Sequence, residues 1–312
     1  MKIVAVESIG ITSSQAGEIK KHFSQLGHDF IFHADRNESS EILIERMQEA
    51  HIVIISNISL TADVLSKCKH LRMLAVAFTG IDHIDTAYCK THNILIRNAS
   101  GYATHAVSEM TIGLILDVYR HLSTMETQCR SLQTRNNSLG RELFGKTVGI
   151  VGTGAIGRRT ALLLKSFGCN VIAWSRSKHP EMIAHQIQYL TLDELLKQSD
   201  IVTLHLPLTA ETHHLLSKEK IALMKSEAVL INTARGNIVD NTALATALTE
   251  QKISGAGIDV YEMEPPLPEN HPLLKAPHCV LKPHIAYATR EAFDKRFDIV
   301  LRNIHDFLNQ NP

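Results

Sequence analysis

Cysteine is scarce and scattered in this chain. The 312 residues include only five cysteines, Cys68, Cys89, Cys129, Cys169 and Cys279. An odd number without paired spacing argues against a disulfide framework and fits a reducing compartment. The sequence therefore predicts a cytoplasmic protein whose fold does not depend on disulfide bonds.

Net charge and long apolar stretches are also lacking. Lys plus Arg and Asp plus Glu number 32 each, so no overall field attracts nucleic acid or an anionic membrane surface. Residues 1–7 resemble a first strand rather than the apolar core of a signal peptide, and no run approaches transmembrane length. We expect a soluble protein with neither partner. The 18 histidines show no HExxH or similar ligand spacing, so no metal is expected.

Apolar residues, by contrast, are plentiful at 44%, and this length favours two domains. Short apolar runs alternate with helical patterns, as is typical of parallel α/β sheets. A long helix is predicted over 101–122, and a polar loop over 128–140. The predicted strands are 2–6, 51–56, 71–78, 148–151, 170–174, 201–206, 228–233, 255–260 and 279–282.

The most informative motif is a glycine-rich loop. An apolar run over 147–151 leads into Gly152, Thr153, Gly154, Ala155, Ile156 and Gly157, and an amphipathic segment follows. In such a loop the first glycine allows a tight turn, the second lets the backbone approach a pyrophosphate, and the third packs helix on strand. A bare GxGxxG is weak evidence because glycines also occur in ordinary turns. The strand before it and the helix after it favour a dinucleotide-binding loop.

Cofactor selectivity is indicated about 20 residues beyond the loop, where an acid would bind the ribose 2′-hydroxyl. The chain has Ser175, Arg176 and Ser177 there, with no carboxylate. An arginine and two hydroxyls suit a 2′-phosphate, so NADP is favoured over NAD. The alternative is that Arg176 is a solvated loop residue and the ribose is held in another way.

Three further residues follow predicted strands on the edge where doubly wound sheets bind ligands. Arg235 suits bidentate binding of a carboxylate, His284 suits proton transfer to a carbonyl oxygen, and Glu264 suits support of the imidazolium. Taken singly, each is more often an ordinary surface residue. Their joint placement after a dinucleotide loop favours catalysis. Asp259 has two open interpretations, contact with the nicotinamide carboxamide or capping of a turn.

Several stretches together resemble the D-isomer specific 2-hydroxyacid dehydrogenase family over nearly the whole chain. They are 78–85 (FTGIDHID), 98–103 (NASGYA), 148–157, 204–209 (LHLPLT), 231–236 (INTARG) and 283–286 (PHIA). The resemblance implies that Arg235, Glu264 and His284 are the catalytic residues. It also implies cofactor contacts at His205, Pro207, Thr233, Ala234, Asp259 and His284, besides the glycine loop and residues 175–177.

The same resemblance implies an architecture of two Rossmann-like, doubly wound parallel-sheet domains. A cofactor domain (99–286) is inserted into a discontinuous substrate domain (1–98 plus 287–312), with active-site closure between them. Backbone amides at Thr79 and Gly80 would help to bind the substrate carboxylate, and Tyr287 is a candidate pocket wall. A homodimer through the cofactor domain is expected, with 101–145 contributing.

Four positions depart from the family's common pattern. Ser175 stands where many members have an NAD-selecting aspartate, while Ser100 and Glu227 replace a frequent proline and a frequent glycine. Lys282 stands where a small residue often precedes Pro-His. A cation there would disfavour a protonated His284 unless its side chain points away. The sequence leaves that orientation open.

The leading hypothesis is reduction of a small 2-oxo acid, such as glyoxylate or hydroxypyruvate, by NADPH or NADH. One alternative is a dinucleotide-sensing protein of the corepressor type, because such proteins share the fold and triad. Those proteins usually carry extended tails, which this sequence does not show. A third interpretation, phosphite oxidation, would use the same triad.

Overall fold

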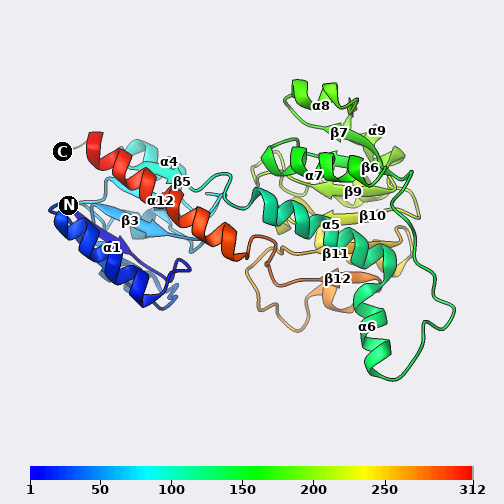
Figure 1. The fold of residues 1–312 in the computed structure, drawn as a ribbon, viewed down its shortest axis with the longest axis horizontal. Coiled ribbons are helices and arrows are strands. Elements are labelled where there is room, and N and C mark those ends of the chain that lie inside the picture. Colours follow the sequence, from blue (N-terminus) through cyan, green and yellow to red (C-terminus); the bar gives the residue numbers. More distant parts are fainter. Residues whose placement is uncertain (311–312) are drawn as a thin grey trace. The chain divides into compact units, whose positions relative to one another are not determined.

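The computed structural model describes residues 1–310. The chain divides into two compact units, one formed by residues 1–103 with the segment from Thr289 onward, the other by residues 104–288. Their limits differ by a few residues from the predicted domain boundaries. Each unit has a parallel sheet with helices packed on it, so the predicted α/β class is confirmed (Figure 1).

The first unit has a five-stranded parallel sheet in the order β2-β1-β3-β4-β5. Its strands are β1 (Lys2–Ala5), β2 (Asp29–Phe32), β3 (Ile52–Ile55), β4 (Met73–Val76) and β5 (Leu95–Asn98). Its helices are α1 (Ser13–Gln25), α2 (Ser40–Met47), α3 (Ala62–Leu65), α4 (Thr86–Thr91) and α12 (Arg290–Gln310). The C-terminal helix α12 contacts β4 and β5, so the end of the chain completes the unit that the beginning starts.

The second unit has a seven-stranded parallel sheet in the order β12-β11-β10-β9-β6-β7-β8. Its strands are β6 (Thr147–Val151), β7 (Asn170–Trp174), β8 (Gln188–Tyr189), β9 (Ile201–Leu204), β10 (Val229–Asn232), β11 (Gly255–Ile258) and β12 (Cys279–Leu281). Its α-helices are α5 (Thr104–Arg120), α6 (Leu122–Arg130), α7 (Ala155–Ser166), α8 (Pro180–Ala184), α9 (Leu192–Gln198), α10 (Lys218–Ile221) and α11 (Asn241–Thr249), and its 3-10 helices are η1 (Gly236–Ile238) and η2 (Pro272–Lys275).

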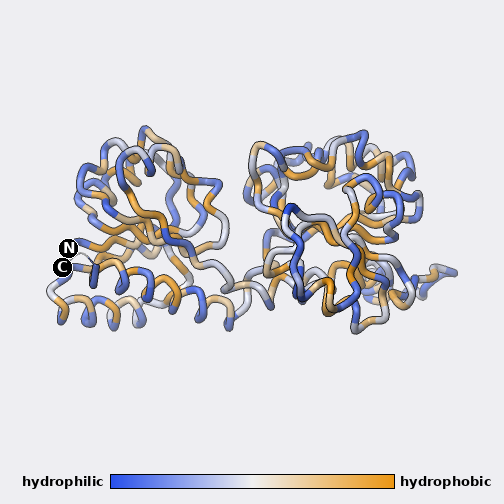
Figure 2. The backbone as a smooth tube through the Cα atoms, turned by 90° about the horizontal axis from the view of Figure 1, so that it is seen from above, coloured by the Kyte–Doolittle hydropathy of each residue, from blue (hydrophilic) through white to orange (hydrophobic). Residues whose placement is uncertain are grey.

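Hydrophobic burial explains why these segments form central strands. Every residue of β3, β4, β9 and β10 is buried, and apolar side chains dominate these four strands. Strands covered by helices on both faces have this continuous apolar character. Figure 2 shows the same pattern, with hydrophobic backbone at the sheets and alternating character along the amphipathic helix α12.

Local signals define several helix ends. Thr191 and Glu194 form a capping box at α9, where each side chain accepts the other residue's backbone N–H. Gly168 follows α7 with φ +76°, the left-handed conformation in which glycine commonly ends a helix. These contacts and conformations fix the start of α9 and the end of α7.

The structure corrects the prediction between residues 101 and 140. The helix expected over 101–122 ends at Arg120, His121 adopts a left-handed φ of 55°, and α6 then continues to Arg130. The loop predicted from residue 128 therefore begins too early. The side chain of Asp117 accepts the backbone N–H of Ser123, six residues later in the chain, at 2.8 Å, and this contact across the helix break stabilises the start of α6.

Across residues 1–310, helices long enough for a bilayer lack the apolar character that a membrane span requires. Within the same residues, no group of three or more His, Cys, Asp or Glu side chains is placed to hold a metal ion.

Candidate active site

The glycine loop connects β6 to α7 as the sequence predicts. Gly152 has φ +100°, and a Cβ at this position would lie 2.5 Å from the carbonyl oxygen of His205. At Gly157 a Cβ would lie 2.0 Å from the carbonyl oxygen of Gly152. Both contacts are with backbone, which cannot move aside without shifting the strand. These two glycines are therefore required by packing.

Gly154 differs from its two neighbours in the motif. A Cβ there would meet no heavy atom of the described chain within 4 Å, and Gly154 is the N-cap of α7 without a side-chain hydrogen bond to the first turn. The first amides of a helix lack partners within the helix and attract anions. An exposed glycine beside such a helix end fits a dinucleotide pyrophosphate, because backbone and phosphate can approach closely.

Hydrogen bonds hold the glycine loop in place, and some of them come from residues that the sequence analysis did not single out. The Tyr189 hydroxyl donates to Oγ1 of Thr153 at 3.2 Å, and Thr153 is fully buried. Arg158 Nη1 donates to the carbonyl oxygen of Thr153 at 3.1 Å. The Thr153 hydroxyl in turn donates to the carbonyl oxygen of Ser177 at 3.4 Å. These bonds join the glycine loop to the segment after β7.

The residues proposed for cofactor selectivity lie on that segment. Ser175 is half-buried, whereas Arg176 and Ser177 are exposed. Arg176 is close enough to Glu211 for its positive charge to help lower the pKa of that carboxyl, after the larger effect of the Thr209 hydroxyl bond. The guanidinium is thus at the surface, with an acidic neighbour that limits its net positive potential.

Arg235 occupies a tightly defined turn at the end of β10. Asn232 is fully buried; its Nδ2 donates to the carbonyl oxygen of Arg235 at 2.9 Å and its Oδ1 accepts the N–H of Ala234 at 3.0 Å. A Cβ at Gly236 would lie 1.9 Å from the carbonyl carbon of Tyr261. The turn therefore requires an asparagine before the arginine and a glycine after it, and it holds Arg235 half-buried.

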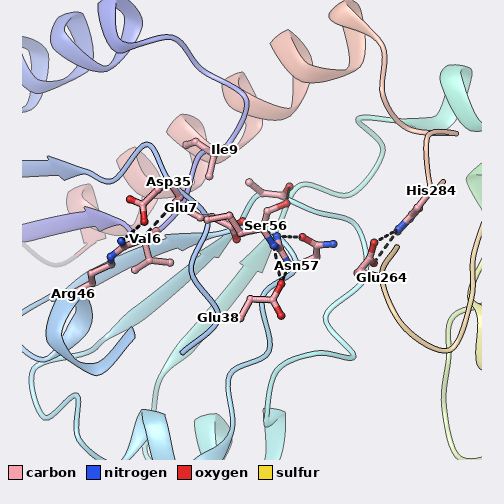
Figure 3. Close-up of polar contacts among 12 residues, drawn as sticks. Val6, Glu7, Ile9, Asp35, Glu38, Arg46, Ser56, Asn57, Glu264 and His284 are labelled. Atoms are coloured by element: carbon pink, nitrogen blue, oxygen red, sulfur yellow. Dashed lines mark hydrogen bonds and ion pairs between the residues drawn. The ribbon is translucent and has the colours of Figure 1, made fainter. Parts of the chain in front are cut away.

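His284 and Glu264 meet as the sequence predicts (Figure 3). Nδ1 of His284 lies 2.8 Å from Oε2 and 2.9 Å from Oε1 of Glu264. The His284 side chain is 11% exposed and that of Glu264 is 47% exposed. The ring of Tyr287 contacts the imidazole edge-on, at a centroid distance of 5.1 Å. Nδ1 is thus directed at the carboxylate, which orients the ring.

Asp259 fixes the backbone that follows His284. It is fully buried, and its two oxygens accept the N–H groups of Ile285 and Ala286, both at 2.8 Å. Burial raises the pKa of this carboxyl, while the two amides oppose that shift. Of the two interpretations open for Asp259, these contacts describe the turn cap. His284 itself has φ +56°, a conformation that side-chain-bearing residues adopt rarely.

The other predicted cofactor residues lie along the same edge of this sheet. His205 contacts Thr203 Oγ1 through Nε2 at 3.1 Å, and desolvation lowers its pKa to about 3, so the ring is neutral at pH 7. Thr233 is buried with its hydroxyl 3.0 Å from that of Thr111 on α5. Pro207 is exposed and Ala234 is half-buried.

Thr79 and Gly80 belong to the first unit and follow β4. Asn98 Nδ2 donates to the carbonyl oxygen of Thr79 at 2.6 Å, and Asn303 of α12 donates to the carbonyl oxygen of Asn98 at 3.1 Å. The loop is thus tied to β5 and to the C-terminal helix. These two bonds anchor the loop backbone, as binding of a carboxylate by amides would require.

Sequence reasoning missed the supporting residues Asn232, Tyr189 and Arg158. Asn232 had a usable signal, because an asparagine side chain after a strand often accepts the backbone N–H two residues on, here that of Ala234, and so organises a turn. Tyr189 lies on the short strand β8, beyond the range of any motif. Its contact with the glycine loop depends on the order of strands in the sheet.

Comparisons with known proteins identify the family of this chain. Residues 112–286 match the model of the D-isomer specific 2-hydroxyacid dehydrogenase, NAD binding domain. A glyoxylate reductase of Thermofilum pendens is 40% identical over 83% of this chain and 78% of its own length. A hydroxypyruvate reductase of Blautia hydrogenotrophica is 31% identical over 100% of this chain and 98% of its own.

A solved structure is similar over the whole chain. An acyclic imino acid reductase in complex with NADPH and D-Arg matches with a TM-score of 0.90 and 31% identity, covering 100% of this chain and 98% of that one. The family match, the full-length relatives and the loop for a dinucleotide lead to one conclusion. The chain belongs to the D-isomer specific 2-hydroxyacid dehydrogenase family and is an oxidoreductase dependent on a nicotinamide dinucleotide.

Proposed function

We propose that this protein is an NADPH-preferring reductase of small 2-oxo acids, with glyoxylate and hydroxypyruvate as the first substrates to test. The observation that carries the proposal is the His284–Glu264 pair, at 2.8 Å, in the same unit as Arg235 and the open position at Gly154. The names of the similar reductases from Thermofilum pendens and Blautia hydrogenotrophica support this choice of substrates.

The proposed chemistry adds a hydride and a proton to a carbonyl group. The bound nicotinamide supplies the hydride to the carbonyl carbon. Arg235 binds the substrate carboxylate through its two-pronged guanidinium and polarises the adjacent carbonyl. His284 donates the proton from Nε2 to the carbonyl oxygen, and Glu264 stabilises the imidazolium through Nδ1. In the oxidative direction the same nitrogen accepts the proton.

We assign the second unit to the cofactor and the first unit to the substrate. The glycine loop would hold the pyrophosphate, and Thr79 and Gly80 would add backbone amides for the substrate carboxylate. Tyr287 lies against His284 and would form one wall of the substrate pocket. His205, Pro207, Thr233 and Ala234 would line the path of the dinucleotide.

The preference for NADPH rests on the segment after β7. Ser175, Arg176 and Ser177 offer a cation and two hydroxyls where a ribose-binding carboxylate would repel a 2′-phosphate. Arg176 is exposed and so is accessible to that phosphate. The similar imino acid reductase was solved with NADPH, which supports the same choice.

The direct test is a steady-state panel of 2-oxo acids, each with NADPH and with NADH, on the wild type and His284→Ala. We expect kcat/KM to be highest for a small 2-oxo acid with NADPH, and His284→Ala to lower kcat by about 10²- to 10⁴-fold. Near wild-type turnover in that variant would refute the proton-transfer role. Cofactor binding without turnover would favour a sensing protein, and activity on phosphite with NADP would favour phosphite oxidation.

Imine reduction is a second candidate because the acyclic imino acid reductase matches over the full chain. A 2-imino acid presents the same carboxylate to Arg235 and a C=N bond in place of C=O. The discriminating assay adds methylamine to each 2-oxo acid with NADPH. Faster NADPH oxidation and formation of the N-methyl amino acid would favour imine reduction.

We also propose that two copies associate through the segment 101–145. Its apolar side chains Leu132, Leu139 and Phe144 are 95%, 76% and 78% exposed, and such surface favours burial in an interface. Light scattering coupled to size exclusion should give twice the mass of one chain. Leu139→Asp combined with Phe144→Asp should return the mass of a monomer.

A further inference from the structure

Asp117 makes contacts with two separate parts of the second unit. Its carboxylate, on α5, accepts the backbone N–H and the hydroxyl of Ser123 at 2.8 and 2.6 Å, at the start of α6. Its Oδ2 also lies 3.5 Å from Nζ of Lys282, which follows β12. The Asp117 side chain is 10% exposed and that of Lys282 is 28% exposed. A largely buried carboxylate thus holds the ammonium of a residue two positions before His284.

The backbone around Lys282 is fixed independently of this ion pair. The N–H of Lys282 donates to the carbonyl oxygen of Ile258 at 2.9 Å, and the hydroxyl of Tyr261 donates to the carbonyl oxygen of Lys282 at 2.9 Å. Beyond His284, Asp259 holds the next two amides. Loss of the Asp117 carboxylate would therefore free the lysine side chain without releasing the backbone that carries His284.

The charges around His284 make the direction of that side chain important. Glu264 contacts the ring, Asp259 interacts with it electrostatically, Tyr287 lies at its edge, and Arg235 is the proposed substrate anchor. An additional ammonium near the ring would disfavour the imidazolium that donates the proton. Lys282 is two residues before His284 and has a flexible four-carbon side chain, so without its partner the ammonium is free to leave α5.

We propose that Asp117 is a positioning residue for the reaction, because it holds the Lys282 ammonium against α5 and away from the His284–Glu264 pair. The proposal rests on the proposed role of His284 and adds a residue that touches neither substrate nor cofactor. It also explains how this chain accommodates a lysine directly before Pro283 and His284. The negative charge of Asp117 compensates the positive charge that Lys282 introduces.

The test compares Asp117→Asn, Lys282→Met and the double variant by the pH dependence of kcat/KM for 2-oxo acid reduction. In Asp117→Asn the freed ammonium should move the alkaline edge of the profile about 0.5 to 1 pH unit lower, a three- to tenfold loss of activity above that edge. Lys282→Met should keep the wild-type edge. The double variant should regain the wild-type alkaline edge, because it has no Lys282 ammonium that could approach His284.

A matched control is Asp200→Asn, since Asp200 also pairs with a lysine, Lys225 at 2.8 Å, and accepts a backbone N–H, that of Thr147. It lies before β9, at the opposite end of the strands from the catalytic candidates. This variant should lower the melting temperature but leave the pH profile unchanged. Thermal unfolding and NADPH binding of every variant report folding.

Two results would overturn the proposal. One is a wild-type profile in Asp117→Asn, and the other is a double variant whose profile remains as shifted as that of Asp117→Asn, which would indicate a purely structural role. These results differ from failure of the proposed function. If the proposed function were wrong, His284→Ala would retain activity. If only the proposed role of Asp117 were wrong, His284→Ala would still be inactive.

Discussion

Glu264 and His284 follow different strands, β11 and β12, yet a carboxylate oxygen of one lies 2.8 Å from Nδ1 of the other. This bond orients the ring and places a negative charge beside the nitrogen that would carry positive charge during the proposed proton transfer. The substitution Glu264→Gln keeps the shape of the side chain but removes its negative charge. We expect kcat to fall roughly tenfold to a hundredfold and the alkaline edge of reductive activity to move to lower pH, as measured by kcat/KM profiles from pH 5 to 10.

The control for that substitution is Glu262→Gln, which alters a nearby acid paired with His271 at 3.0 Å. Its melting temperature should fall, because His271 is buried, while the pH profile should keep its wild-type edge. Equal profiles for Glu264→Gln and wild type would contradict the partner role of Glu264.

Arg176→Asp should reverse the cofactor preference. The substitution removes the cation proposed to bind the 2′-phosphate and introduces an acid that can accept a hydrogen bond from the ribose 2′-hydroxyl. We expect the ratio of kcat/KM for NADPH to that for NADH to fall by at least about tenfold, from loss of one charge-assisted contact. Lys197→Asp, on α9, is the matched charge reversal, and the ratio should not respond to it.

The two glycines Gly154 and Gly157 should respond differently to alanine. Gly157→Ala would place a methyl group 2.0 Å from a backbone oxygen, so we expect a loss of about 2 kcal/mol or more and a melting temperature lower by several degrees. Gly154→Ala meets no such atom in the described chain. It should keep the wild-type melting temperature but raise the Kd for NADPH, because the methyl group stands where the pyrophosphate approaches. Calorimetry and fluorescence titration separate these effects, and similar unfolding of both variants would disprove the distinction.

Cysteine reactivity should be confined to one residue. Burial raises the pKa of the Cys68, Cys89 and Cys169 thiols to about 11 and that of Cys279 to about 12, so these four hold little thiolate at pH 7.5. Cys129, on α6, is exposed. Brief treatment of the native protein with iodoacetamide should alkylate Cys129 alone, as read by peptide mass spectrometry. Modification of all five in guanidinium serves as the positive control.

Much of the fold was predictable from local pattern. The apolar runs at 170–174 and 201–206 mark β7 and β9 because strands covered on both faces need continuous hydrophobic side chains. The strands β2, β5 and β8 escaped prediction. All three lie at sheet edges, and their half-exposed residues give a weaker hydrophobic signal. Helix α6 was missed because its N-cap, His121, makes no side-chain cap, and its start is held instead by Asp117 of the preceding helix.

The sequence by itself determined the family, the α/β class and the candidate residues Arg235, Glu264 and His284, because each follows or precedes a short motif whose chemistry is local. Tertiary structure alone decided how side chains from separate strands meet. It placed Asp259 beneath the His284 turn, joined Tyr189 to the glycine loop and directed Lys282 to Asp117. These contacts depend on strand order and helix packing, and spacing along a chain does not specify distances between neighbours that folding brings together.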